Sequence, residues 1–148
     1  MAFLGQYEHT LDAKNRLTIP SRFRAALSDG VILGRSIDPC LCIYTPEGWE
    51  RFTNTWVRSR DPLNPEARQL QRYFHGGAFD SALDAAGRIM LPQPLVDHGG
   101  LRKEVVVVGC DDWIEVWDRD SFRAHERESD PSIGDTAQRL ASNAPISK

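Results

Sequence analysis

Two short motifs, each an aspartate followed four positions later by an arginine, are the residues in this sequence best suited to recognising a charged ligand. They are Asp12–Arg16 and Asp84–Arg88. A carboxylate can accept hydrogen bonds from the N–H groups of a tight turn, and a guanidinium presents a planar fork that matches phosphate or guanine. Each motif therefore predicts a rigid hairpin that presents its arginine to nucleic acid. The alternative is an Asp–Arg pair that only stabilises the hairpin, and both hold if the aspartate orients the arginine.

Further cations follow the first motif. Lys14 lies at the apex of its turn and Arg22 and Arg24 come soon after, so residues 14–24 hold four cations and no acid. Residues 1–110 contain 13 basic and 12 acidic side chains, whereas residues 111–148 contain 5 and 9. The net charge of −3 thus hides a local basic patch, which can bind DNA even on an acidic protein.

The other reactive side chains give no catalytic or metal-ligating pattern. Cys40, Cys42 and Cys110 are an odd set without a Cys-x-x-Cys pair, which predicts reduced structural thiols and neither a disulfide framework nor a typical zinc site. The four histidines lack metal-ligand spacing, and the sequence carries no cofactor-binding fingerprint. Asp111 and Asp112 fit a turn between two apolar strands, although an enzyme using this carboxylate pair is an alternative. We therefore expect no metal, no cofactor and no catalytic site.

The sequence around the two motifs is repeated. Residues 11–24 and 83–96 align at an offset of 72, with 5 of 14 residues identical. The apolar runs at 31–33 and 41–44 recur in the same order at 105–108 and 114–117. The chain therefore contains two copies of one unit, each read as strand, tight turn, strand, short helix, two strands and helix.

Local patterns place these elements. Alternation over residues 7–12 predicts a half-buried strand, and residues 13–15 fit a three-residue hairpin loop that ends in a left-handed residue, Asn15 in the first copy and Gly87 in the second. Capped helices are expected to begin after Thr45 and Asn64. Their apolar stripes would be Trp49, Phe52 and Trp56 in the first, and Ala67, Leu70 and Phe74 in the second.

Length and composition set wider limits. The 148 residues suit one domain or two small intertwined ones, and 41% hydrophobic with 26% charged residues is ordinary for a globular chain. No apolar run approaches the roughly 20 residues that span a bilayer, and the first residues do not resemble a secretory signal. We therefore expect a cytoplasmic protein, with a polar, flexible tail from about residue 129.

Taken together, these segments resemble the MraZ family of bacterial transcriptional regulators. The resemblance covers about residues 1–127, and the stretches that carry it are Phe3–Pro20, Asn64–Arg72, Leu83–Ile89, Gly100–Gly109 and Glu115–Asp118. It implies an α+β, β-rich fold of two AbrB-like (SpoVT-AbrB, swapped-hairpin) repeats that form an intramolecular pseudo-dimeric β-barrel with short flanking helices. The implied segments are repeat 1 (5–52), a helical connector (53–78), repeat 2 (79–123) and the tail (129–148).

The resemblance also implies a function. Members form ring-like homo-oligomers in the nucleoid and bind G-rich direct repeats in double-stranded DNA upstream of their own division and cell-wall operon, usually as repressors. The DNA-facing arginine of the family maps onto Arg16 and, in the second copy, onto Arg88, and a basic position maps onto Lys14. Asn15 replaces a more usual glycine, and Ala86 carries no charge, so the second hairpin should read DNA less well.

The sequence thus predicts a non-enzymatic, sequence-specific DNA-binding regulator. Arg16 would contact guanine, and further cations would contact DNA phosphates. The DNA-binding set is Lys14, Arg16, Arg22, Arg24 and Arg88, and the residues that orient the hairpins are Asp12, Asn15, Asp84 and Gly87. The alternative is a protein-interaction or antitoxin-like module that uses the same basic hairpins.

Overall fold

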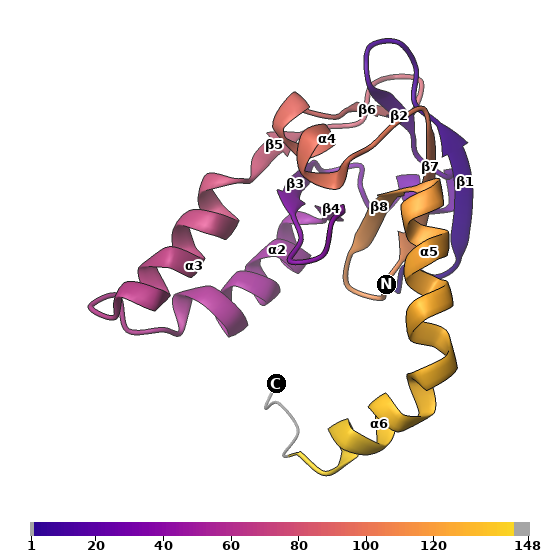
Figure 1. The fold of residues 1–148 in the computed structure, drawn as a ribbon. Helices are drawn as coiled ribbons and strands as arrows, with labels where there is room; N and C mark the ends of the chain where they lie inside the picture. The colour runs from indigo at the N-terminus through magenta and orange to yellow at the C-terminus, as the bar shows by residue number, and fades with distance from the viewer. Residues whose placement is uncertain (1, 144–148) are drawn as a thin grey trace.

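The computed structural model describes residues 2–143, which form two similar series of strands and helices joined by a helical arm (Figure 1). The strands are β1 (Gln6–Thr10), β2 (Arg16–Thr18), β3 (Val31–Arg35), β4 (Leu41–Tyr44), β5 (Phe79–Ser81), β6 (Arg88–Met90), β7 (Glu104–Gly109) and β8 (Ile114–Asp118). The α-helices are α1 (Ser21–Arg24), α2 (Pro46–Thr53), α3 (Pro65–Gly76), α4 (Gln93–Gly99), α5 (Arg119–Ser129) and α6 (Ile133–Ala141). Two further helical turns are η1 (Asn54–Arg58), a π-helix, and η2 (Asp130–Ser132), a 3₁₀-helix.

Six strands form one antiparallel sheet in the order β1-β7-β8-β4-β3-β5. Strand β1 of the first repeat pairs with β7 of the second, and β5 of the second repeat pairs with β3 of the first. Exchanging equivalent strands of the two repeats leaves this order unchanged, so a pseudo-twofold axis passes between β8 and β4. The two repeats therefore share one sheet, and the expected α+β, β-rich class with exchanged strands is confirmed.

The sheet is not closed into a barrel, which corrects one detail of the expectation. Its edge strands are β1 and β5. Within residues 2–143, the remaining strands β2 and β6 pair only with each other, as a separate two-stranded ribbon. Each edge strand leads through its hairpin loop into the ribbon. The chain therefore folds over one face of the sheet without the edges meeting.

The β2–β6 ribbon has one buried face and one outward face. Leu17 pairs with Ile89 at its centre, and both are fully buried. Because side chains alternate along a strand, the neighbouring positions point the other way. On that outward face, Arg16 pairs with Met90 and Thr18 pairs with Arg88.

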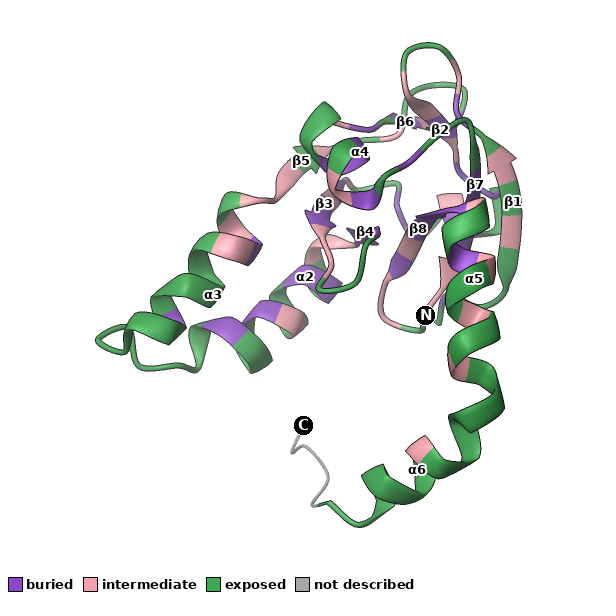
Figure 2. Cartoon of the chain, viewed as in Figure 1, coloured by how far each residue is buried: buried purple, intermediate pink, exposed green. Residues whose placement is uncertain are grey.

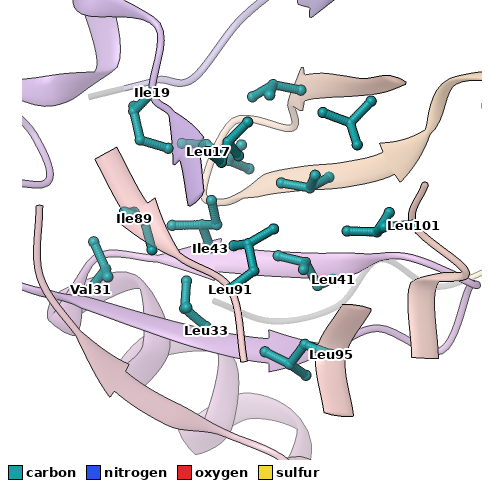
Figure 3. Close-up of a cluster of buried hydrophobic side chains, with 14 of the residues drawn as sticks. Leu17, Ile19, Val31, Leu33, Leu41, Ile43, Ile89, Leu91, Leu95 and Leu101 are labelled. Carbon is teal, nitrogen blue, oxygen red and sulfur yellow. The ribbon is translucent and has the colours of Figure 1, made fainter. Parts of the chain in front are cut away.

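The main core lies between this ribbon and the sheet. Figure 3 shows Leu17, Ile19, Ile89 and Leu91 in one cluster with side chains from β3 and β4. Two smaller apolar clusters cover the opposite face of the sheet: one lies beneath α2 and α3 around Trp49, and the other lies beneath α5. Figure 2 shows the same arrangement, with burial concentrated on the sheet and on the inner sides of the helices.

The helix starts agree with the sequence, but two apolar stripes do not. Thr45 and Asn64 cap α2 and α3, each with a proline at the first turn. Trp56 is 41% exposed because the π-helical turn η1 widens the helix and places Val57 inward instead. Leu70 is also exposed, so the sequence stripes were wrong at these two positions.

The C-terminal segment is helical as far as it is described. Helices α5 and α6 extend away from the sheet (Figure 1), and α6 contains no buried residue. The low content of large apolar residues in this segment accounts for the exposure of α6. The last part of the predicted flexible tail, residues 144–148, lies outside the described residues.

Within residues 2–143, every helix is too short or too polar to cross a bilayer.

We predict that the two faces of the ribbon respond differently to truncation. Leu17→Ala should lower the free energy of unfolding by roughly 2–5 kcal/mol, because it opens a cavity in the core. Met90 lies on the outward face of the neighbouring strand β6 and is 58% exposed. Met90→Ala should therefore change the free energy of unfolding by less than about 0.5 kcal/mol. Urea denaturation followed by tryptophan fluorescence measures both, and equal losses would contradict the two-faced ribbon.

Candidate functional site

The first hairpin tip, residues 12–16, is held together by one carboxylate. Asp12 Oδ1 accepts hydrogen bonds from the backbone N–H groups of Lys14 and Arg16, both at 2.9 Å. Its Oδ2 accepts from Arg16 Nε at 2.6 Å. Asn15 adopts the left-handed conformation (φ 57°), as its sequence position predicted. The loop is therefore fixed through both the backbone and the side chain of Arg16.

The second hairpin tip, residues 84–88, repeats this arrangement. Asp84 Oδ1 accepts from the N–H groups of Ala86 and Arg88 at 2.9 Å, and Oδ2 accepts from Arg88 Nε at 2.9 Å. Gly87 takes the left-handed position with φ 76°. The two Asp-x-x-x-Arg motifs thus form the same structure, including the Asp–Arg pair that sequence reasoning left open.

Hydrogen bonding keeps both aspartates ionised. The N–H group of the following arginine is the main cause that lowers the pKa of Asp12, and the side chain of Arg16 lowers it further. The same contacts lower the pKa of Asp84. Each carboxylate binds only Nε of its arginine. Among residues 2–143, the two terminal Nη groups of Arg16 and of Arg88 have no hydrogen-bond partner, so each arginine can still bind a ligand end-on.

The two arginines occupy one outward face. Their side chains are 28% exposed in Arg16 and 34% in Arg88. Backbone bonds from Leu91 to Asn15 and from Ile19 to Gly87 extend the ribbon at both ends. The two hairpin tips therefore lie at opposite ends of a short ribbon. Four residue steps of about 3.3 Å separate Asn15 at one end from Ile19 at the other, which gives a length of roughly 13 Å. Figure 1 shows both loops at the same end of the molecule.

The cation patch predicted over residues 14–24 is divided in the structure. Lys14 is exposed at the first tip, but Arg22 donates to Tyr7 Oη at 3.1 Å on β1. Arg24 donates from Nε to the carbonyl of Ile19 at 2.8 Å and lies against Gly87 of the second tip. Strand exchange explains the difference, because α1 follows the first hairpin in sequence but lies beside the second in space.

Two cations that sequence reasoning missed lie beside the first tip instead. The N–H of Leu11 donates to the carbonyl of Lys103 at 2.8 Å, and an open groove there is lined by Asp12, Asn15, Arg102 and Lys103. Arg102 bonds the buried carboxylate of Asp118 at 3.0 Å, while Lys103 is exposed. No local pattern in the sequence indicates this placement, because Lys103 reaches the first tip through the pairing of β1 with β7.

The equivalent place beside the second tip carries no such cations. Val105 pairs with His9, and the equivalent pair in the other half of the sheet is Val31 with Ser81. Lys103 lies two residues before Val105 and Asp29 lies two residues before Val31, so these two residues occupy equivalent positions. The first tip therefore has Lys14 at its apex and Lys103 nearby, whereas the second has the uncharged Ala86, the acidic Asp29 and the Arg24 guanidinium against Gly87. The two sides of the ribbon differ in charge.

The carboxylate pair considered for an enzyme is occupied structurally. Asp111 adopts a left-handed conformation (φ 65°) in the turn between β7 and β8. Asp112 binds Arg51 of α2, with N–O distances of 2.9 and 3.3 Å. These contacts assign the pair to the turn and to fixing α2 on the sheet.

Comparisons with known proteins agree with the resemblance seen in the sequence. Residues 2–73 and 74–143 each match the family model described as "MraZ protein, putative antitoxin-like". A protein named transcriptional regulator MraZ from Lachnoclostridium phytofermentans is 39% identical over 133 residues, which cover 90% of this chain and 93% of that protein. One of the same name from Alkaliphilus metalliredigens is 37% identical over 138 residues, covering 93% and 96%.

We predict that the second tip tolerates only glycine at its left-handed position. Gly87→Ala should destabilise the protein by about 1–2 kcal/mol, because alanine disfavours positive φ. Its Cβ would also come within 2.6 Å of Arg24 Nε. Gly134→Ala in α6, where nothing lies within 4 Å, is the control and should be neutral or slightly stabilising. Thermal denaturation of both variants measures this, and an unaffected Gly87→Ala protein would contradict the left-handed conformation at this position.

Proposed function

The chain belongs to the MraZ family, and from this premise we propose that it is a DNA-binding transcriptional regulator that reads DNA with the outward face of the β2–β6 ribbon. The observation that carries the proposal is the pair of carboxylate-held arginines, Arg16 and Arg88, on that one face. The name transcriptional regulator, carried by both relatives, supports the same conclusion.

The ribbon has the shape and the donors for the major groove. That groove admits a two-stranded β-ribbon, and arginine contacts guanine through O6 and N7 with a discrimination of about 1–3 kcal/mol. Arg16 offers its two Nη groups for this contact, because Asp12 holds the guanidinium by Nε alone. The bond to Asp12 also fixes the side chain before binding, which reduces the entropy lost when the complex forms.

The first tip is the principal reader in this proposal. Lys14 at its apex and Lys103 beside it are placed to contact phosphates on either side of the groove. Arg22 is a further phosphate ligand. We assign Arg24 a different role from the one its sequence position suggested: it supports the second tip at Gly87, and Arg88 makes the second, weaker contact.

Self-association would supply the affinity that one tip lacks. A single module with few base contacts binds weakly, whereas several linked modules engaging repeated sites gain effective concentration. A ring-like homo-oligomer that binds G-rich direct repeats upstream of its own operon, as a repressor in the cytoplasm and nucleoid, fits this requirement. Exposed apolar residues on the η1–α3 arm offer a surface for such contacts: Trp56 (41% exposed), Leu63 (83%) and Leu70 (36%).

The proposal treats the protein as a non-enzymatic regulator. A protein-interaction module that uses the same tips remains the competing function, favoured by the words antitoxin-like in the family description. The two differ in one measurable respect: a regulator retains operator DNA at moderate salt through Arg16, whereas an interaction module would need Arg16 only for a protein partner.

We predict that Arg16 carries specific DNA binding. Arg16→Ala should weaken binding to DNA upstream of the protein's own gene by about 1–3 kcal/mol, or roughly 5- to 150-fold, in gel shifts and footprints. Arg88→Ala should have a smaller effect. Arg139→Ala, an exposed arginine on α6, is the matched control and should bind like the parent. Light scattering should show an unchanged mass for all three, and footprints unaffected by Arg16→Ala would refute the proposal.

We also predict that Lys103 contacts a phosphate. Lys103→Ala should weaken binding to specific and random DNA equally, and should reduce the slope of log K against log salt by about 1. Asp29→Ala, at the equivalent place in the first repeat, should not weaken binding. A salt slope that Lys103→Ala leaves unchanged would remove this residue from the interface.

A further inference from the structure

Two cysteines and a glutamate meet on the face of the sheet opposite the ribbon. Cys42 of β4 stands directly across from Glu115 of β8, and Cys40 lies two residues before Cys42. The two thiol sulfurs and a carboxylate oxygen of Glu115 all lie within 4.8 Å of one another. Cys40 and Cys42 are buried, and Glu115 is half-buried. These residues come from distant parts of the chain and are joined by the pairing of the two central strands.

The Glu115 carboxylate is positioned by tryptophan side chains. Trp113 Nε1 donates to Oε2 at 3.1 Å, and Trp117 Nε1 donates to Oε1 at 2.9 Å. Within residues 2–143, Glu115 forms no ion pair with a lysine, arginine or histidine. Two indole donors therefore hold the carboxylate in place while its negative charge has no cationic partner. Hydrogen-bonded carboxylates and imidazoles are oriented in the same way around metal ions.

Burial and neighbouring groups raise the pKa of two thiols, those of Cys40 and Cys110. Contact with Cys42 and burial raise the pKa of the Cys40 thiol. Burial and the nearby Glu115 carboxylate raise the pKa of Cys110 to about 12, so the third cysteine of the chain also lies close to this carboxylate. A metal ion would oppose this effect, because metal binding displaces thiol protons.

We propose that Cys40, Cys42 and Glu115 bind one zinc-class divalent cation. Thiolate and carboxylate donors suit zinc, and Zn–S bonds of about 2.3 Å in a tetrahedron place neighbouring donors roughly 3.8 Å apart. The observed spacing needs only a small contraction to reach this. Binding would form two Zn–S bonds and one Zn–O bond and release two thiol protons to solvent, leaving the fourth position to water.

Such an ion would join the centre of the sheet on the side away from the DNA-reading ribbon. Strands β4 and β8 flank the pseudo-twofold axis, so the cation would link the two repeats at the centre of the sheet that they share. The inference does not depend on the proposed function. A failure of metal binding would leave the arginine tips unaffected, and a failure of DNA binding would leave the thiol site unaffected.

The test uses the full chain, without a tag, fully reduced and stripped of metal. Cobalt(II) serves as a spectroscopic probe and zinc as its competitor. The expected result is that one equivalent of cobalt binds with release of about two protons and gives a thiolate-to-metal charge-transfer absorption, which one equivalent of zinc then abolishes by displacing the cobalt without further proton release. Zinc should also raise the unfolding temperature, because it binds only the folded chain. Absence of stoichiometric binding by the parent chain overturns the proposal without recourse to variants.

Variants then identify the ligands. Cys40→Ser and Cys42→Ser should each abolish the charge-transfer absorption, whereas Cys110→Ser, outside the group of three, should retain one equivalent of cobalt. Glu115→Gln keeps an acceptor for one indole and should weaken binding while preserving the fold, which covers the case that the serine variants do not fold. Cobalt binding unaffected by Cys40→Ser or by Glu115→Gln, or lost in Cys110→Ser, would overturn the assignment of these three ligands.

Discussion

Backbone pairing between β2 and β6 is the interaction on which the rest of this structure depends. Among the described residues these two three-residue strands pair with no other strand, and each comes from a different repeat. Isolated two-stranded ribbons are marginal in water, so this one persists because Leu17 and Ile89 anchor it to the sheet's core. The same pairing brings Arg16 and Arg88 onto one surface. Neither repeat could form the core or the paired arginines alone.

The aspartates stabilise the hairpin tips, which lack the packing of the core. A loop that must project into solvent loses the packing that rigidifies the core, and its backbone N–H groups need acceptors. Asp12 and Asp84 provide acceptors and also hold the arginine by Nε, so the turn and the guanidinium are ordered by one group. The sequence analysis allowed structural pairing and ligand presentation together on the condition that the aspartate orients the arginine. In this geometry they are compatible, because the Nη groups are not used by the pair.

Short-range patterns in the sequence predicted local structure correctly, but they did not predict which residues lie next to each other in space. The repeat, the left-handed Asn15 and Gly87, and the capped helix starts follow from short-range chemistry, and the structure has them. The place of Arg24 depends on strand exchange, which brings α1 to the other hairpin, and Lys103 and Glu115 reach their neighbours through pairing across long stretches of chain. Trp56 was wrongly assigned to the buried stripe, because a single π-turn changes which side of the helix this residue faces. Residue spacing along the chain predicts neither the strand exchange, nor the long-range pairing, nor the π-turn.

Carrying both repeats in one chain allows them to differ, which a symmetric homodimer of single repeats could not do. Three matched positions have diverged in charge: Lys14 against Ala86, Lys103 against Asp29, and Arg24 against Val96. The first two increase positive charge around the first tip, and the third places a guanidinium against Gly87. The two repeats therefore retain the ribbon, whose pairing needs both copies, while the two tips differ in charge. The first tip is strongly basic and the second has a supporting role.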